Sequence, residues 1–122
     1  MAATVGPALE SSIRRTPAGS TVLVTGDLDL ASVPALEAQI LAALETRPGH
    51  LIIDLSDVSF IDSSGVHLLE RIRREARERG VALTAVAPTG PARRVFALTG
   101  RESILSASAP DSPPRFLTDW TR

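Results

Sequence analysis

The apolar residues of this chain occur at two alternating spacings, which predicts that strands alternate with helices. The segment 16–20 contains the turn residues Pro17 and Gly19, so the apolar runs before and after it are expected to pair as an antiparallel hairpin. Short apolar runs predict strands at residues 9–15, 21–25, 51–55 and 81–87, and a weaker run predicts a last strand at 103–107.

Apolar residues at helical spacing predict two long helices, over residues 32–45 and 64–79. Pro34 is compatible with the first turn of the first helix, and Gly80 is expected to end the second. Between the strand at 51–55 and the second helix, residues 56–62 are predicted to form a loop.

A short third helix is predicted after the strand at 81–87. Thr89 is expected to cap this helix, and Gly100 is expected to end it. Val95 and Leu98 are predicted to face the core from it.

Strands that alternate with helices imply right-handed crossovers and therefore an α/β fold. We expect a mostly parallel sheet with one antiparallel N-terminal strand and helices packed around it. Residues 1–108 are predicted to form one domain, and residues 109–122 a proline-containing C-terminal tail. In that tail, Phe116, Leu117 and Trp120 have the spacing of a single helical turn that packs back onto the domain.

Composition narrows the range of functions. A net charge of -1 over 122 residues gives no general electrostatic reason to bind nucleic acid or an anionic membrane. The sequence has no apolar span long enough to cross a membrane, no secretory signal and no cysteine, so a cytoplasmic protein is expected.

Lysine is absent, because all 13 basic residues are arginines. This excludes the P-loop and Schiff-base enzymes, which require a lysine. His50 and His67 are the only histidines, and a zinc site without cysteine would need unusual ligands. We therefore expect no metal and no cofactor.

Charged residues are concentrated on the predicted helix 64–79. Glu70 with Arg74 and Glu75 with Arg79 have the favourable i, i+4 order, and each such pair stabilises a helix by about 0.2–0.5 kcal/mol. The simplest interpretation is a solvated helix face whose arginines are paired locally.

The junction before this helix carries the strongest functional signal. Asp62, Ser63, Ser64 and Gly65 follow an apolar run and precede the helical pattern, so they are expected at a helix N-terminus. The first N–H groups of a helix lack internal partners, which favours an oxygen acceptor or a phosphate there.

Acidic residues follow two of the predicted strands. Asp27 and Asp29 follow one strand, and Asp57 and Asp62 follow the next, so the carboxylates are expected at one edge of the sheet. They can cap helices and turns. Alternatively, they could hold magnesium for phosphoryl chemistry, although no basic group accompanies them.

Read in order, residues 26–29 (Gly-Asp-Leu-Asp), residues 54–65, which end in Asp-Ser-Ser-Gly, and residues 80–83 resemble an anti-sigma factor antagonist of the STAS-domain family. The resemblance covers roughly residues 9–107. It implies a non-enzymatic regulator of transcription that binds an anti-sigma factor when unmodified. It also implies that an anti-sigma factor serine kinase phosphorylates Ser63 and that a serine phosphatase resets the protein.

Roles for the neighbouring residues follow from this resemblance. Asp62 would shape the loop, Ser64 would be an alternative cap or second acceptor, and Gly65 would let another backbone come close. The expected partner-binding residues are Asp27, Asp29, Asp62, Ser63, Ser64 and Gly65. Two departures from the family are visible: the helix begins Gly65-Val66-His67, where a leucine and a second glycine are common, and the proline-containing tail replaces a longer final helix.

Two alternatives remain open at this point. One is a STAS subunit that does not switch and serves as a scaffold or as part of a transporter. The other is a magnesium-dependent phosphohydrolase that uses the acidic edge of the sheet.

Overall fold

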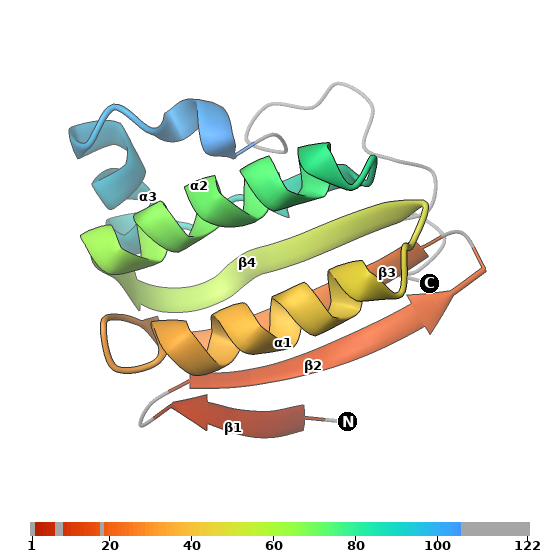
Figure 1. Cartoon of the computed structure of the whole chain (residues 1–122). Coiled ribbons are helices and arrows are strands. Elements are labelled where there is room, and N and C mark those ends of the chain that lie inside the picture. The colour runs from red at the N-terminus through yellow and green to blue at the C-terminus, as the bar shows by residue number, and fades with distance from the viewer. Residues whose placement is uncertain (1, 7–8, 18, 106–122) are drawn as a thin grey trace.

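The computed structural model describes residues 2–6, 9–17 and 19–105 of the chain, as an α/β arrangement of helices against one sheet (Figure 1). In chain order its elements are β1 (Ala2–Gly6), β2 (Leu9–Thr16), β3 (Gly19–Leu28), α1 (Val33–Glu45), β4 (His50–Ile61), α2 (Ser63–Glu78), β5 (Ala82–Val86), α3 (Gly90–Leu98) and the short 3-10 helix η1 (Glu102–Ile104).

The strands form one sheet in the order β1-β2-β3-β4-β5. β2 pairs antiparallel with both β1 and β3, whereas β3, β4 and β5 are parallel. This confirms the predicted α/β fold and the predicted hairpin, in which Thr16 is opposite Gly19. The sequence does not predict β1, because the small residues at 2–6 do not alternate between apolar and polar side chains as those of a strand do.

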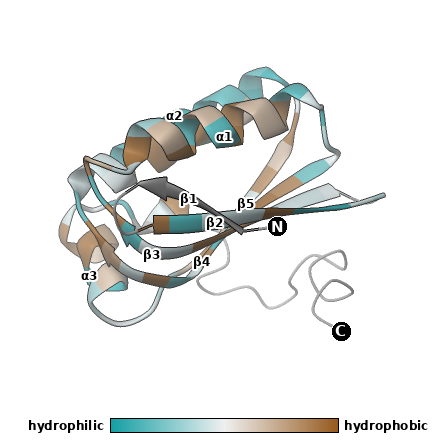
Figure 2. Ribbon diagram, turned by 90° about the horizontal axis from the view of Figure 1, so that it is seen from below, coloured by the Kyte–Doolittle hydropathy of each residue, from teal (hydrophilic) through white to brown (hydrophobic). Residues whose placement is uncertain are grey.

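The core lies between the sheet and two helices. Figure 2 shows α1 and α2 side by side on one face of the sheet, with α3 packed beside β4 and away from them. Leu36 and Ile40 of α1, Ile72 of α2 and Ile53 of β4 are completely buried in the shared core. Burying side chains of this kind contributes about 1.5–3 kcal/mol each, so these apolar faces fix both helices on the sheet.

The prediction of a loop at residues 56–62 is wrong, because β4 continues to Ile61. Its pairing with β3 shifts twice, after Leu23 and after Gly26, and at each shift β4 uses one residue more than β3. Such bulges break the two-residue alternation. Val58 and Ile61 are buried three residues apart, a spacing that does not resemble a strand in the sequence.

Two predictions for the C-terminal part are also corrected. Leu98 does not face the core, since it is 79% exposed, and Ala92 and Phe96 form the buried side of α3. Residues 102–104 form η1 instead of a strand. Residues 106 and 107 of that predicted strand and the tail with Phe116, Leu117 and Trp120 lie outside the described residues.

Candidate functional site

Ser63 is the first residue of α2, one position earlier than the sequence predicts. Its side chain is exposed. Within the described part of the chain, its hydroxyl makes no hydrogen bond. Ser63 therefore presents a free hydroxyl to solvent at the positive end of the helix dipole.

Asp62 caps α2 and also accepts a hydrogen bond from the loop that follows β3. Its Oδ1 accepts hydrogen bonds from the backbone N–H groups of Ser64 at 2.9 Å and Gly65 at 3.3 Å. Its Oδ2 accepts a third from the N–H of Leu30 at 3.3 Å. The donors that open α2 are thus already used by a carboxylate, and a phosphate on Ser63 would lie beside that negative charge.

Asp27 and Asp29 lie at the same end of the sheet, because Leu28 is paired with Ile61 just before Asp62. Asp29 accepts hydrogen bonds from the backbone of the next turn, at residues 31 and 32. Asp27 accepts one from the hydroxyl of Ser59 at 3.3 Å. The structure therefore places Asp27, Asp29 and Asp62 at the same end of the sheet as Ser63, each accepting a local hydrogen bond. Asp57 does not join them, because it lies within β4, where it is paired with Thr25.

Gly65 has a different role from the one expected. It is buried, and a Cβ added to it would lie 2.6 Å from Ile61 Cγ1 and 2.9 Å from Leu28 Cγ. The missing side chain makes room for this protein's own core, so Gly65 does not offer its backbone to a partner. It allows α2 to begin close against β3 and β4, which positions Ser63. Ser64 is half-buried beside it, with its N–H bonded to Asp62.

Two exposed apolar side chains at this end were not predicted as part of the site. Leu30 is 73% exposed and Phe60 is 49% exposed. Leu30 is tied to Asp62 through its N–H, and Phe60 is paired with Asp27 across the strands. Both side chains therefore leave apolar area accessible at the end of the sheet that carries Ser63. Leu30 could have been noticed in the sequence, because an apolar leucine stands there in a turn that is otherwise expected to be polar.

The described acidic residues show no arrangement for a metal ion. Among the described residues, no group of three or more histidine, aspartate or glutamate side chains is placed to hold one. The described helices also include none that is long and apolar enough to span a membrane.

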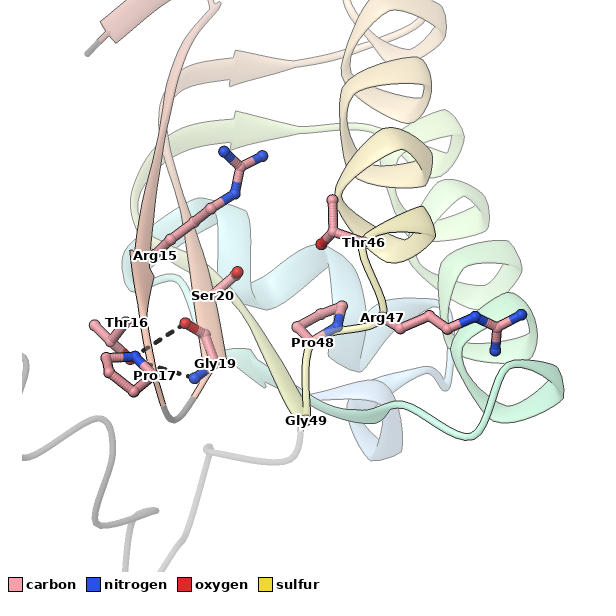
Figure 3. Close-up of a pocket in the computed structure, with 9 residues that line it drawn as sticks. All are labelled: Arg15, Thr16, Pro17, Gly19, Ser20, Thr46, Arg47, Pro48 and Gly49. Atoms are coloured by element: carbon pink, nitrogen blue, oxygen red, sulfur yellow. Dashed lines mark hydrogen bonds between the residues drawn. The ribbon is translucent and has the colours of Figure 1, made fainter.

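A separate depression of about 490 Å³ lies at the other end of β3 and β4, lined by the turn between β2 and β3 and by the connection from α1 to β4 (Figure 3). In it the Thr16 hydroxyl bonds the backbone of Gly19, and Arg47 extends away from Ser20. Because Ser63 follows the end of β4, this depression is not part of the same site.

Replacing Asp62 by alanine is expected to destabilise the domain by about 2 kcal/mol, because it removes a helix cap together with the bond to the Leu30 loop. Urea unfolding measures the change. Asp57→Ala removes an exposed carboxylate from β4 and is the control, with an expected change within about 0.5 kcal/mol. Equal unfolding midpoints for the two variants would contradict the structural role of Asp62.

Comparison with protein families gives a match to the STAS domain over residues 11–111. The fold is also similar to solved structures. An anti-sigma factor antagonist from Mycobacterium paratuberculosis is 29% identical, with a TM-score of 0.73, and the match covers 93% of this chain and 95% of that one.

The anti-sigma factor antagonist SpoIIAA in its unphosphorylated form has 23% identity and a TM-score of 0.68, with 92% of this chain and 96% of that chain covered. The phosphorylated form of SpoIIAA, described as a Bacillus cell fate determinant, has 24% identity and a TM-score of 0.64, with 92% and 99% covered. At these identities, both SpoIIAA structures support the fold.

Proposed function

Because this chain belongs to the STAS domain family, we propose that it is an anti-sigma factor antagonist whose binding is switched off by phosphorylation of Ser63. In this proposal it binds an anti-sigma factor when unmodified and so regulates transcription that depends on the sigma factor. The anti-sigma factor is also the serine kinase, and a serine phosphatase restores the unmodified state. The chain acts by binding and not by catalysis.

The observation that carries this proposal is the free, exposed hydroxyl of Ser63 at the start of α2. A kinase can reach a hydroxyl in this position without unfolding the domain. The similarity to the mycobacterial antagonist, over nearly the whole length of both chains, supports the same function.

The surroundings of Ser63 supply a contact surface. Leu30 and Phe60 provide apolar area, and burying exposed apolar side chains is a main source of affinity between proteins. Asp27, Asp29 and Asp62 provide carboxylates for arginine or lysine side chains of the partner. Ser64 is a further predicted contact, whereas the buried Gly65 contributes by fixing the position of the helix start.

The switch follows from charge. A phosphoserine carries about -1.5 to -2 charges at neutral pH and is tolerated at a helix N-terminus, so the domain stays folded. At the interface the new charge would lie beside Asp62, whose carboxylate already occupies the Ser64 and Gly65 N–H groups. A partner that fits the neutral hydroxyl would then face unpaired, desolvated negative charge, which costs several kcal/mol.

Incubation with the kinase and ATP tests the proposal. The chain is expected to gain one phosphoryl group, mapped by mass spectrometry to Ser63. Ser63→Ala is expected to gain none and to keep its affinity for the anti-sigma factor. Ser64→Ala is the matched control and is expected to be phosphorylated normally.

The principal alternative is a STAS scaffold that binds partners without switching. It predicts that the wild-type chain gains no mass on Ser63 while still forming a stable complex. The magnesium-dependent phosphohydrolase has no support from the described residues, because their carboxylates bond the local backbone and hydroxyls and do not converge on a common point.

A further inference from the structure

The outer face of α2 carries more uncompensated positive charge than the sequence predicts. The predicted pair of Glu75 with Arg79 is present at 3.3 Å. The predicted pair of Glu70 with Arg74 is not formed, because Glu70 lies 2.6 Å from the Nε of Arg101, which follows α3.

Glu37 of α1 forms an ion pair with Arg71 of α2. Arg71 donates two hydrogen bonds to the carboxylate of Glu37 on α1, at 2.9 and 3.0 Å. These bonds lower the pKa of Glu37 below its ordinary value, against the opposing effect of burial. Glu37 is therefore a charged partner for Arg71 and is not available to the other arginines of α2.

Arg74 and Arg77 remain exposed, and neither has an ion-pair or hydrogen-bond partner within the described part of the chain. Arg73 lies beside them and donates a hydrogen bond from Nη1 to the backbone oxygen of Ser103 at 2.8 Å, which leaves its charge unpaired. The three guanidinium groups border a groove of about 300 Å³ between α2 and η1, lined by Glu70, Arg73, Arg74, Arg77, Ser103 and Ile104.

We propose that this groove, here called the α2 arginine groove, binds an acidic segment of a partner protein. Among the described lining residues the one acid is Glu70, which Arg101 already pairs, so Arg73, Arg74 and Arg77 are left to present positive charge to a ligand. Arginine binds carboxylates through two parallel hydrogen bonds, and an acidic peptide would satisfy the groups that this protein leaves unpaired.

The same observations favour a peptide over a nucleic acid. Single-stranded nucleic acid is held by aromatic stacking as well as by charge, and none of the described residues that line the groove is aromatic. Arg73 and Arg77 are about 6 Å apart along the helix axis, which suits two or three neighbouring carboxylates better than a long phosphate backbone. The groove is also separate from the Ser63 site, since Arg77 lies about 21 Å from Ser63 along α2.

Titration of the ¹⁵N-labelled chain with a hexaglutamate peptide, followed by NMR at low salt, tests this proposal. We expect saturable shifts confined to α2 and residues 101–105. Arg77→Gln should weaken binding about threefold, and the Arg74→Gln/Arg77→Gln pair about tenfold, as expected for exposed charge pairs. Arg79→Gln is the matched control, because it removes the same charge from the same helix at an arginine that Glu75 already pairs; its effect should be less than twofold.

The groove proposal is overturned if hexaglutamate causes no saturable shifts, or if Arg79→Gln weakens binding as much as Arg77→Gln does. It is also overturned if a single-stranded oligonucleotide of equal charge binds more tightly than the peptide, because the ligand would then be a nucleic acid. None of these outcomes depends on the Ser63 switch, since the titration uses the unphosphorylated chain without kinase.

Discussion

Ser63→Asp is expected to weaken binding to the anti-sigma factor about 100-fold, which corresponds to about 3 kcal/mol. The aspartate would place a permanent negative charge next to Asp62, at a position where the protein has a neutral, exposed hydroxyl. The domain itself should change in stability by less than about 0.5 kcal/mol, because acidic residues are favourable in the first turn of a helix and the Ser63 hydroxyl has no hydrogen bond to lose within the described residues.

Ser63→Asn separates charge from shape, since asparagine has the size of aspartate without its charge. Its affinity for the anti-sigma factor should remain within about threefold of that of the wild type, as befits an exposed site. Titration calorimetry measures both affinities, and thermal unfolding measures both stabilities. If the two variants lost the same affinity, the effect would be steric, and the electrostatic account of the switch would be wrong.

Phe60→Ala is expected to weaken the same complex about 30-fold, or about 2 kcal/mol, while leaving the free domain almost unchanged in stability. Aromatic side chains at the centre of an interface often dominate its affinity. Phe60 is half-exposed in the free domain and lies beside Asp27, at the end of the sheet where Ser63 is found. Its burial would therefore come from the partner.

Leucines provide the control for this prediction. Leu30 and Leu98 are exposed to a similar degree, 73% and 79%, but only Leu30 is bonded to the Ser63 site, through Asp62. Leu30→Ala should lower the affinity for the anti-sigma factor several-fold. Leu98→Ala, on the last turn of α3, should leave it unchanged. Equal effects of the two leucine variants would place the interface elsewhere.

Much of the fold could be predicted from the sequence because its strongest periodicities are those of buried faces. Helix α1 buries Leu36, Ile40 and neighbouring apolar residues in the core. Their spacing in the sequence predicts both ends of this helix to within one residue. The second half of β4 could not be predicted from the sequence, because each bulge inserts an extra residue and interrupts the apolar–polar alternation of a strand. In α3 the sequence does not show which side meets β4: its spacing predicts that Leu98 faces inward, whereas the structure buries Phe96.

In the candidate site, too, the contacts made within one segment could be predicted from the sequence, whereas the contacts between distant segments could not. The cap by Asp62 follows from local rules, because an aspartate before a helix accepts bonds from the first N–H groups. Its third bond, to Leu30, depends on two strands meeting and has no local signal. The packing of Gly65 against Ile61 and the pairing of Glu70 with Arg101 are likewise tertiary contacts, and each changed the role that the sequence suggested.

The most direct test compares the anti-sigma factor affinity of one preparation of the chain before and after complete phosphorylation on Ser63. We predict tight binding before and binding weaker by about 1000-fold after, which is about 4 kcal/mol, with no loss of the folded state by circular dichroism. Equal affinity of the unmodified and phosphorylated chains would contradict the account.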